Sequence, residues 1–453
     1  MPRTQFVAAP PEGSDLKQIS GPATHWIAQL QRQRRDPTGA AFEDEAAYGP
    51  LYVLNMFGDK WIIAGGPEAA QRILMNKDRV FANGPAWAPL QGPFFDRGLV
   101  RLDFDEHRSH RSIMQQAFGR GALTSYLKDM HEIADRHLSR LPEGSVADGN
   151  PVLMHQHLQR LTLDIVLEVF MGARLPRDEA ERICGATMDI LQAGGAMVRV
   201  AIPGNRWWRG MRARKTMAAF LADRIVAARE NPGTDLLSML CQAAGDDGDR
   251  FTDQDIVNHM IFLLAAAHDT TTTTLSGVVY NMAKYPEWQK RARARSLEMP
   301  FELGYDELAE LTELDWIIKE TTRLCTPVQI FPRAVQEDTE VCGYFVPKGS
   351  FVVVPISVNH RRPDMWSHPE EFDPERFSDE RAEHKRHRVA WAPFGAGAHK
   401  CLGQHFAGLE IKTIVHQLLH TFEWEVPQDY VMPLDMSATP LPKDDLPVTL
   451  RRR

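Results

Sequence analysis

The stretch Trp391-Ala-Pro-Phe-Gly-Ala-Gly-Ala-His-Lys-Cys-Leu-Gly403 sets Phe394, Gly397, Cys401 and Gly403 at fixed offsets, in the pattern F-x-x-G-x-x-x-C-x-G. Three glycines in this stretch permit a backbone that turns closely around one sulfur. A helix is predicted to begin just after Cys401, and the N–H groups and dipole of its N-terminus favour a thiolate. No second Cys or His stands at chelate spacing, so the sequence predicts a single axial thiolate on haem iron. The alternative is a buried structural cysteine in a turn.

Composition limits the class of protein further. The 453 residues are 43% hydrophobic and 25% charged, with 52 Lys and Arg against 60 Asp and Glu, which gives a net charge of −8. This balance is ordinary for a globular chain and argues against a disordered chain or a nucleic-acid binder. Five dispersed cysteines without a C-x-x-C pair argue against a disulfide framework or a structural zinc site, and indicate a reducing compartment.

The N-terminal segment lacks the apolar core of a signal peptide. No apolar run approaches the roughly 20 residues that a membrane span needs. A soluble, cytoplasmic protein is therefore expected, and we further expect a monomer.

Apolar periodicity predicts a mainly α fold with a minor β portion. Helices are expected near 25–34, after Pro67, and over 105–118, 122–140, 152–172, 178–195, 211–230, 285–296, 307–324 and 404–420. Strands are expected over 51–57 and 60–65, joined by a turn at Gly58-Asp59, and over 333–335, 340–341 and 351–355. Residues 82–99 and 361–400 are expected to be loops. The sequence predicts one domain over 46–453, with 1–45 as an extension of the same domain.

One predicted helix is unusually long. Thr252 and Asp255 match a capping box and Pro286 marks the stop, so about 33 residues would span about 50 Å. Residues 260–267 are apolar on most faces, and a helix that is apolar nearly all round is buried. This helix is expected to be the central beam of the fold.

Three further segments, in a fixed order with the cysteine loop, resemble one family. They are Ala266-Ala-His-Asp-Thr-Thr271, Glu320-Thr-Thr-Arg323 and Phe372-Asp-Pro-Glu-Arg-Phe377. Together with the loop they resemble the motifs of the cytochrome P-450 superfamily over about residues 45–450. The resemblance implies the cytochrome P-450 fold, with haem b buried between the long helix and the cysteine loop. It also implies a bacterial-type monooxygenase in which Cys401 is the iron ligand.

Glu320 and Arg323 stand three apart on one helix face, so they can pair. Alone, this spacing is equally typical of a solvated surface pair. The resemblance adds Arg376 and implies a buried Glu–Arg–Arg network that holds the 361–400 segment. Its role would be structural.

Four cationic side chains match the family's donors to the two haem propionates: His107, Arg111, Arg333 and His399. His107 and Arg111 are four apart on one helix and point the same way. Taken singly, each would be read as a surface residue. Two buried carboxylates need such donors, which gives the four residues a common purpose.

Asp269 and Thr270 lie midway along the long helix, where a charged residue is seldom buried without a task. The threonines at 270–274 can bond back to the i−4 carbonyl and bend the helix. The resemblance implies that Thr270 hydrogen-bonds the oxygen molecule and that Asp269 relays protons. An ordinary helix with a polar stripe is the alternative. Ala267 departs from the family, which usually has Gly there, and an added methyl group could narrow the oxygen groove.

Family position nominates a substrate pocket that is largely apolar. Its candidate residues are Phe94, Phe95, Ala266, Val328, Ile330, Phe331, Ser437 and Thr439. This lining fits an apolar small molecule, which would be hydroxylated or epoxidised, with a lean toward terpenoid or steroid-like substrates. Trp207-Trp208, expected between two helices, is interpreted as packed, with a substrate entrance or a membrane surface as alternatives.

Electrons are expected from separate proteins, because only 52 residues follow Cys401 and no fused reductase fits there. The resemblance implies a ferredoxin and a ferredoxin reductase that draws on NAD(P)H. The run Arg381-Ala-Glu-His-Lys-Arg-His-Arg388 is basic and leads into the cysteine loop, so it is a candidate docking surface, with an ordinary solvated face as the alternative.

Two other functions stay open at this point. A peroxide-driven or rearranging haem-thiolate enzyme would need no external electrons, but such enzymes often dispense with the proton relay that Asp269 and Thr270 would provide. A non-enzymic haem binder or gas sensor would usually carry an output domain.

Overall fold

A computed structural model describes residues 4–56, 58–172, 174–196, 198–245, 248–436 and 439–453. The chain forms two compact units. The β unit comprises Met1–Pro89, Val100–Phe104 and Val328–Cys401. The helical unit comprises Leu90–Leu99, Asp105–Pro327 and Leu402–Arg453. The single domain expected over 46–453, with 1–45 as its extension, stays a prediction.

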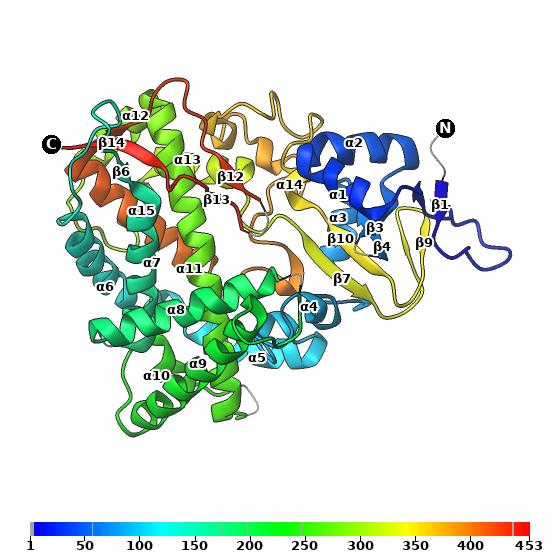
Figure 1. The fold of residues 1–453 in the computed structure, drawn as a ribbon, viewed down its shortest axis with the longest axis horizontal. Helices are drawn as coiled ribbons and strands as arrows, with labels where there is room; N and C mark the ends of the chain where they lie inside the picture. Colours follow the sequence, from blue (N-terminus) through cyan, green and yellow to red (C-terminus); the bar gives the residue numbers. More distant parts are fainter. Residues whose placement is uncertain (1–3, 57, 173, 197, 246–247, 437–438) are drawn as a thin grey trace. The chain divides into compact units, whose positions relative to one another are not determined.

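The β unit is built on a seven-stranded sheet in the order β1-β2-β3-β4-β10-β7-β5 (Figure 1). The β3–β4 hairpin is antiparallel, β10 pairs parallel with β4, and β7 pairs antiparallel with β10. The predicted turn between β3 and β4 is confirmed, and Gly58 there has φ +95°. The strands are β1 Thr4–Phe6, β2 Ser20–Pro22, β3 Leu51–Met56, β4 Asp59–Ala64, β5 Phe81–Ala82, β7 Phe331–Val335 and β10 Phe351–Val354.

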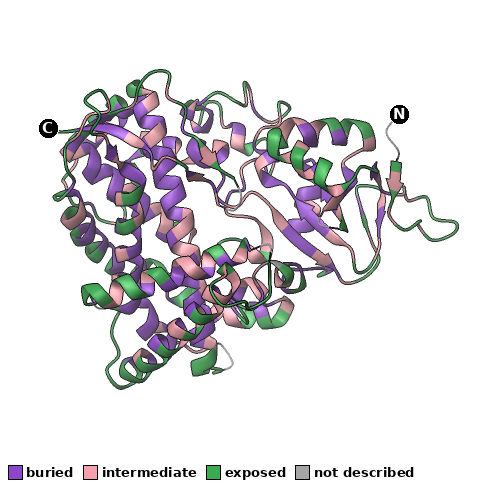
Figure 2. Ribbon diagram, in the orientation of Figure 1, coloured by how far each residue is buried: buried purple, intermediate pink, exposed green. Residues whose placement is uncertain are grey.

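Alternating residues place buried side chains on both faces of this sheet, as the period of two in a strand requires. Leu51 and Val53 point to one face, where they join a buried cluster that includes Leu74. Tyr52 and Leu54 point to the other face and form a smaller cluster with Val353. The strands are therefore mostly buried, as Figure 2 shows.

Short helices and turns complete the β unit. The helices are α1 Trp26–Arg35, α2 Pro37–Tyr48, α3 Pro67–Met75 and α14 Ile356–Asn359, with a second hairpin of β8 Thr339–Val341 and β9 Tyr344–Val346. Residues 361–400 are irregular as predicted, apart from single 3₁₀ turns at Pro374–Phe377, Glu383–Lys385 and Gly397–His399 (η5).

The described part of the helical unit contains ten long or medium helices and two small sheets, β11-β14-β6 and β12-β13. The helices are α5 Phe104–Gln116, α6 Arg120–Leu138, α7 Met154–Met171, α8 Arg177–Gly194, α9 Arg206–Glu230, α10 Leu236–Gln242, α11 Asp253–Lys284, α12 Pro286–Leu297, α13 Thr312–Leu324 and α15 Gln404–Thr421. The strands are β6 Val152–Leu153, β11 Phe422–Glu425, β12 Leu434–Asp435, β13 Leu441–Pro442 and β14 Pro447–Arg452.

The long helix α11 has the predicted bounds and the predicted capping box. The Thr252 hydroxyl accepts from the Asp255 N–H at 3.1 Å, and the Asp255 carboxylate accepts from the Thr252 N–H at 3.3 Å. Its 32 residues span about 48 Å. It packs against α7, α9, α13 and α15, so it is the central beam of the helical unit.

Three expectations need correction. Residues 82–99 are not all loop, because α4 spans Gly84–Gln91 although Pro89 lies inside it. The 25–48 region holds α2 in addition to the single helix predicted there. Trp207-Trp208 does not lie between helices: α9 begins at Arg206, capped by Asn205, whose side chain accepts from the Trp208 N–H at 2.8 Å.

The mainly α fold with a minor β portion is otherwise confirmed. Within the ranges that the structure describes, no helix combines the length and apolar character needed to cross a membrane. All five cysteines lie in those ranges, and none forms a disulfide.

Candidate functional site

The cysteine loop closes on itself by backbone hydrogen bonds within the β unit. The Cys401 N–H donates to the Phe394 carbonyl at 2.8 Å, and the Lys400 N–H donates to the Gly397 carbonyl at 3.2 Å. Cys401 is exposed, so protein atoms do not bury it in a turn. The chain enters α15 at Gln404, three residues later, as predicted. The buried structural cysteine considered from the sequence is therefore excluded.

Two of the three glycines in this loop are required by its shape. Gly395 and Gly397 have φ of +69° and +70°, in the left-handed region that side chains disfavour. A Cβ on Gly397 would also lie 2.1 Å from the Leu74 carbonyl oxygen at the end of α3. Gly403 differs from expectation, because its φ is −85° and no heavy atom lies near a Cβ built there. The loop is thus held against α3 by close backbone contact.

Arg333 on β7 is a buried cation in the same unit as Cys401. Its side chain is 3% exposed, and it donates to the Pro332 carbonyl at 2.8 Å. Burial lowers the pKa of Arg333 to about 10, an effect that the charge of Asp103 partly offsets. Among the described residues, no carboxylate lies within ion-pair distance of it. A buried guanidinium without an ion pair fits an anionic group supplied by a ligand.

His399 lies in η5 of the same unit and is held by two side chains that sequence reasoning missed. Its Nδ1 lies 3.2 Å from Asn83 Nδ2, and its Nε2 lies 3.6 Å from Asp103 Oδ1. Asp103 also accepts from the N–H groups of Asn83 and Gly84, at 2.6 and 2.8 Å, which caps the start of α4. These partners lie up to 316 residues apart, so no local pattern could reveal them.

Asp103 carries a stabilised negative charge. Burial raises the pKa of its carboxyl group. The hydrogen bonds from His399 and from two backbone N–H groups lower that pKa by more than burial raises it, so the net pKa lies below its usual value. An ionised Asp103 orients the His399 ring. The His399 ring is thereby held in place rather than loose on the surface.

The other two predicted donors lie on α5 in the helical unit. His107 is buried, at 2% exposure, and Arg111 is partly buried one turn later on the same face. The alternative that His107 is a surface residue is therefore wrong. Their convergence with Arg333 and His399 stays a prediction, because the two pairs belong to different units.

The threonine run in α11 behaves as its chemistry predicts. The Thr270 hydroxyl donates to the Ala266 carbonyl at 2.7 Å, and Thr274 donates to the Thr270 carbonyl at 2.9 Å. Such i−4 bonds leave the hydroxyl oxygen with lone pairs that a ligand can use. Thr272 bonds back likewise, at 2.9 Å, and also meets Thr162 of α7 at 2.7 Å. Thr270 and Thr272 therefore serve different faces of one helix.

Asp269 is partly buried, and its side chain hydrogen-bonds Thr439. Burial raises the pKa of the Asp269 carboxyl group, and the hydrogen bond with Thr439 opposes that rise in part. A carboxyl group with a raised pKa exchanges its proton more readily near neutral pH. The predicted pocket residue Thr439 thus contacts the predicted relay residue.

Glu320 and Arg323 form a fully buried bidentate pair on α13, with Nε–Oε2 and Nη2–Oε1 distances of 2.7 and 2.8 Å. Both side chains are 0% exposed, so the solvated-pair alternative is wrong. Arg376 is also buried, and in the β unit it contacts Glu383 at 3.4 Å and donates to the carbonyls of Ser367, His368 and Glu371. It therefore pins the 367–371 segment, while the three-residue network stays a prediction.

An aromatic wall forms within the helical unit where family position nominates substrate contacts. Phe94 meets Trp207 of α9 edge to face at 4.9 Å between ring centroids, and Phe95 meets Phe262 of α11 at 5.8 Å. Trp207 is therefore packed, as interpreted from the sequence. The candidates Val328, Ile330 and Phe331 lie in the β unit, and Ser437 lies outside the described residues.

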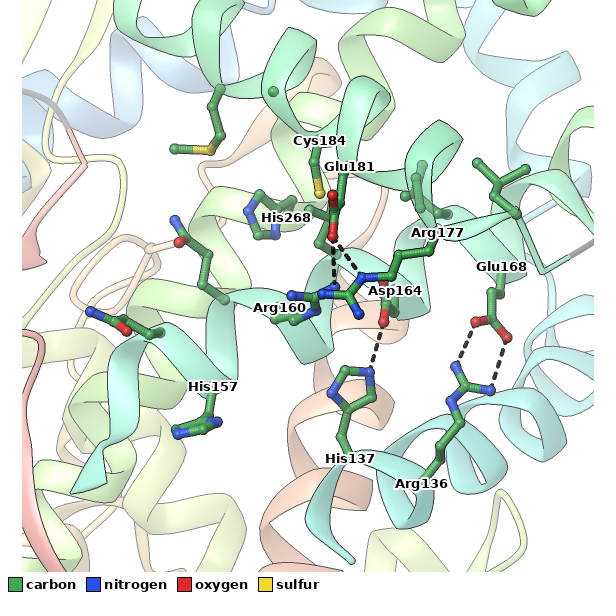
Figure 3. A pocket seen from close by; sticks show the side chains of 18 of the residues that line it. Arg136, His137, His157, Arg160, Asp164, Glu168, Arg177, Glu181, Cys184 and His268 are labelled. Carbon is green, nitrogen blue, oxygen red and sulfur yellow. Dashed lines mark hydrogen bonds and ion pairs between the residues drawn. The ribbon is translucent and has the colours of Figure 1, made fainter. Parts of the chain in front are cut away.

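The helical unit also has a groove of about 930 Å³ between α6, α7 and α8, shown in Figure 3. An ion pair between Arg136 and Glu168 at 2.5 Å and a hydrogen bond between His137 Nε2 and Asp164 Oδ2 at 2.8 Å line it. None of the predicted substrate residues lines this groove. The groove is therefore a separate feature from the candidate site that the sequence predicts.

Comparisons with known proteins show the family to which the chain belongs. The family model described as Cytochrome P-450 matches residues 20–447. A Mycobacterium tuberculosis protein named as cytochrome P-450 136 is 42% identical over 99% of this chain and 91% of its own length. A rice protein named abscisic acid 8′-hydroxylase 3 is 28% identical over 93% of this chain and 84% of its own.

The solved structure of cyanobacterial CYP120A1 with retinoic acid bound is similar throughout. Its TM-score is 0.81 at 27% identity, and the match covers 92% of this chain and 95% of that one. The chain belongs to the cytochrome P-450 family, and it is a haem-dependent monooxygenase with the fold of that family. The family implies a haem held by a cysteine thiolate.

The residues present fit that group. The glycine-framed Cys401 offers one exposed thiol, and Arg333 offers a buried cation without an ion pair. Among the described residues, no cluster of three or more His, Cys, Asp or Glu forms a separate metal site.

Proposed function

We propose that Cys401 is the axial ligand of haem b and that this chain inserts one oxygen atom from O₂ into an apolar isoprenoid, with electrons from a ferredoxin. One observation carries the proposal: an exposed thiol on a glycine loop and a buried, ion-pair-free guanidinium lie in the same compact unit. In this arrangement Phe394, Gly397 and Gly403 frame the ligand.

Four side chains would hold the haem propionates: Arg333 and His399 from the β unit, and His107 and Arg111 from α5. Each is a cationic or N–H donor, and buried carboxylates need such partners. Asp103 would keep His399 in position. When bound, the haem supplies the activation of O₂, and the protein supplies donors, protons and a shaped site.

Asp269 and Thr270 would deliver protons in our proposal. The Asp269 carboxyl group has a raised pKa and a single described tether at Thr439, so it can exchange a proton with solvent and turn. The Thr270 hydroxyl donates to Ala266 and retains acceptor capacity toward the site. Their retention disfavours the peroxide-driven or rearranging alternative, and membership of an enzyme family disfavours a non-enzymic haem binder.

The substrate class is an apolar isoprenoid. The predicted site residues Phe94, Phe95, Ala266, Val328, Ile330 and Phe331 are apolar. The named ligand of the cyanobacterial structure and the named substrate of the rice relative, retinoic acid and abscisic acid, are both isoprenoid carboxylic acids. These names support the lean toward terpenoid-like substrates.

A reconstituted turnover tests the proposed function. The holoprotein is mixed with a ferredoxin, its reductase and NADPH under isotope-labelled O₂, with retinoic acid and neutral terpenoids as probes. We expect a product that carries one labelled oxygen atom. Haem-loaded, reducible protein that oxygenates none of the isoprenoid probes but oxygenates a fatty acid or a planar aromatic would contradict the isoprenoid class.

We propose that a ferredoxin docks on the surface formed by Lys385, Arg386, Arg388 and Lys400. We also propose that the protein is a cytoplasmic monomer. All four residues are exposed in the unit that carries Cys401. Arg381 does not belong to this surface, because it pairs closely with two carboxylates, Asp373 at 2.5 Å and Glu383 at 2.7 Å, whereas Lys385 meets the exposed Asp379 more loosely, at 3.6 Å. An acidic partner is therefore expected to meet a smaller cluster than the sequence run suggests.

Reversing Lys385 and Arg386 to Glu is expected to slow the first electron transfer at low salt by roughly 10- to 1,000-fold, because steering between opposite charges is lost. The difference should shrink as salt rises, since the screening length falls to about 8 Å near 0.15 M. Stopped-flow reduction across a salt series measures it, with Lys348→Glu, elsewhere in the β unit, as the matched control. Equal reduction rates at low salt would assign the cluster to ordinary solvated surface.

A further inference from the structure

Arg214 of α9 is a half-buried cation in the aromatic wall of the helical unit. Its Nε donates to the Phe94 carbonyl at 3.2 Å, and its Nη2 donates to Asn258 Oδ1 of α11 at 2.6 Å. Phe94 in turn packs on Trp207, two turns earlier on α9. The guanidinium therefore sits where three candidate substrate elements meet: residues 90–99, α9 and α11.

The positive charge of Arg214 is not neutralised by a neighbouring acid. Both of its hydrogen-bond acceptors are neutral, and among the described residues no carboxylate lies within ion-pair distance. Asp96 attracts it only from farther away, and burial lowers the pKa of Arg214 despite that attraction. Buried or half-buried charges are normally paired, so an unpaired guanidinium beside aromatic rings is a candidate anion site.

The residue spacing along α11 relates Asn258, which Arg214 contacts, to Thr270, where oxygen would bind in the proposed function. Asn258, Phe262, Ala266 and Thr270 follow one another at intervals of four residues, so they form one ridge along the helix. Asn258 and Thr270 are about 18 Å apart along the helix axis at 1.5 Å per residue. A molecule that reaches both ends of this ridge must be extended, and its middle would cross Phe262 and Ala266.

We infer that Arg214 binds the carboxylate of an extended apolar acid, whose hydrocarbon part lies along the Phe262–Ala266 ridge with its far end toward Thr270. The inference rests on the proposed function and narrows its substrate class to carboxylic acids. Arg214 Nη1 makes no hydrogen bond to the described residues, so a carboxylate can take it without breaking the bonds to Phe94 and Asn258. The alternative is that Arg214 only tethers the 90–99 segment to α9, and this alternative predicts no preference for acids over esters.

Paired ligands separate these readings. Retinoic acid and its methyl ester, and palmitic acid and its methyl ester, are titrated into the holoprotein while the haem Soret band is followed. A charge-assisted hydrogen bond should favour each bound acid over its ester by about 10- to 100-fold in Kd. Arg214→Gln should weaken the acids by that factor and leave the esters unchanged, and Arg214→Lys should retain part of the preference. Arg212→Gln, an exposed arginine on the same helix that stacks on Trp208, is the matched control and should change nothing.

Each other outcome overturns the inference in a distinct way. Equal Kd values for acid and ester in the wild type would remove the anion site while leaving the proposed monooxygenase function intact. Equal weakening of acids and esters by Arg214→Gln would assign Arg214 to the structural tether. If Arg214→Gln fails to load haem, two measurements still test the anion site: the ratio of acid to ester Kd in the wild type and the same ratio in Arg214→Lys. A wild type that binds neutral terpenoids but none of the four probes would contradict the acid class alone, whereas one that binds no isoprenoid would contradict the proposed function too.

Discussion

At the scale of single residues, two threonine hydroxyl groups on α11 differ in their surroundings. Thr270 and Thr272 both donate to the i−4 carbonyl, at 2.7 and 2.9 Å. The Thr272 hydroxyl also hydrogen-bonds the Thr162 hydroxyl, whereas Thr270 has no such side-chain partner among the described residues. Side-chain chemistry is the same in both, so their surroundings decide which one can meet a ligand.

Thr270→Ala is expected to keep haem and substrate binding but to uncouple turnover, because the hydroxyl that orders proton delivery is gone. Product formed per NADPH should fall several-fold, with the missing electrons appearing as peroxide or water. Thr272→Ala, which loses a matched i−4 bond on another face, should keep its coupling. Unchanged coupling in Thr270→Ala would remove that residue from the mechanism.

The sequence pointed to candidate site residues more readily than to the residues that hold them in place. Cys401, Thr270 and the Glu320–Arg323 pair stand in short patterns, and short patterns survive without knowledge of the fold. Asn83, Asp103 and Arg214 act through partners that are distant in the chain, so no spacing announces them. The lack of an ion pair at Arg333 and Arg214 cannot be read from the sequence, because it depends on which carboxylates the fold brings near each guanidinium.

At the scale of elements, α13 is fixed by a charge pair that has no access to water. Glu320 and Arg323 are both 0% exposed and bonded through two hydrogen bonds. Removal of one partner takes away this bidentate contact from a charge that stays buried, which costs several kcal/mol in comparable proteins. The pair is therefore a condition for folded protein rather than for the reaction.

Glu320→Ala is expected to lower the free energy of unfolding by about 3–5 kcal/mol, a large share of the roughly 5–15 kcal/mol available to a typical domain. Haem content and melting temperature are the measurements. Glu313→Ala, in the first turn of the same helix, should cost well under that amount. A Glu320→Ala variant that is fully haem-loaded and melts like the wild type would contradict this account of the pair.

Helix prediction succeeded where one apolar stripe dominates and failed where tertiary partners decide. The bounds of α6, α7, α11 and α15 follow their periodicity within a few residues. α4 was missed because glycine and proline argue against a helix, while Asp103 caps its first N–H groups from 20 residues away. α9 begins before its periodic stretch because Asn205 caps it.

At the scale of the whole molecule, buried histidines make stability depend on pH. Burial lowers the pKa of His259 to about 3 and those of His268 and His416 to about 4, from 6.5. The unfolded chain therefore takes up protons below pH 6.5 that the folded chain refuses. Stability is full above that pH and is lost progressively as pH falls toward 4, by at most about 1.4 kcal/mol per pH unit for each ring.

His259→Asn is expected to flatten this loss, because one of the three rings no longer takes up a proton on unfolding. Its ring nitrogen Nε2 lies 2.8 Å from His110 Nδ1, and Asp255 and Arg97 are the other charged groups that act on it. Denaturant unfolding at pH 7 and pH 5 gives the difference in unfolding free energy, which should be smaller in the variant. Equal differences in the two proteins would show that His259 does not titrate on unfolding.

The reduced carbon monoxide complex tests the central claim most directly, namely that Cys401 holds the haem. The account predicts that the wild type and Cys342→Ala, which lacks the other exposed cysteine, show the red-shifted Soret band of thiolate ligation. Cys401→Ala should lose that band, whether or not it retains some haem. A Cys401→Ala protein that keeps the thiolate band would contradict the account, because another group would then be the ligand.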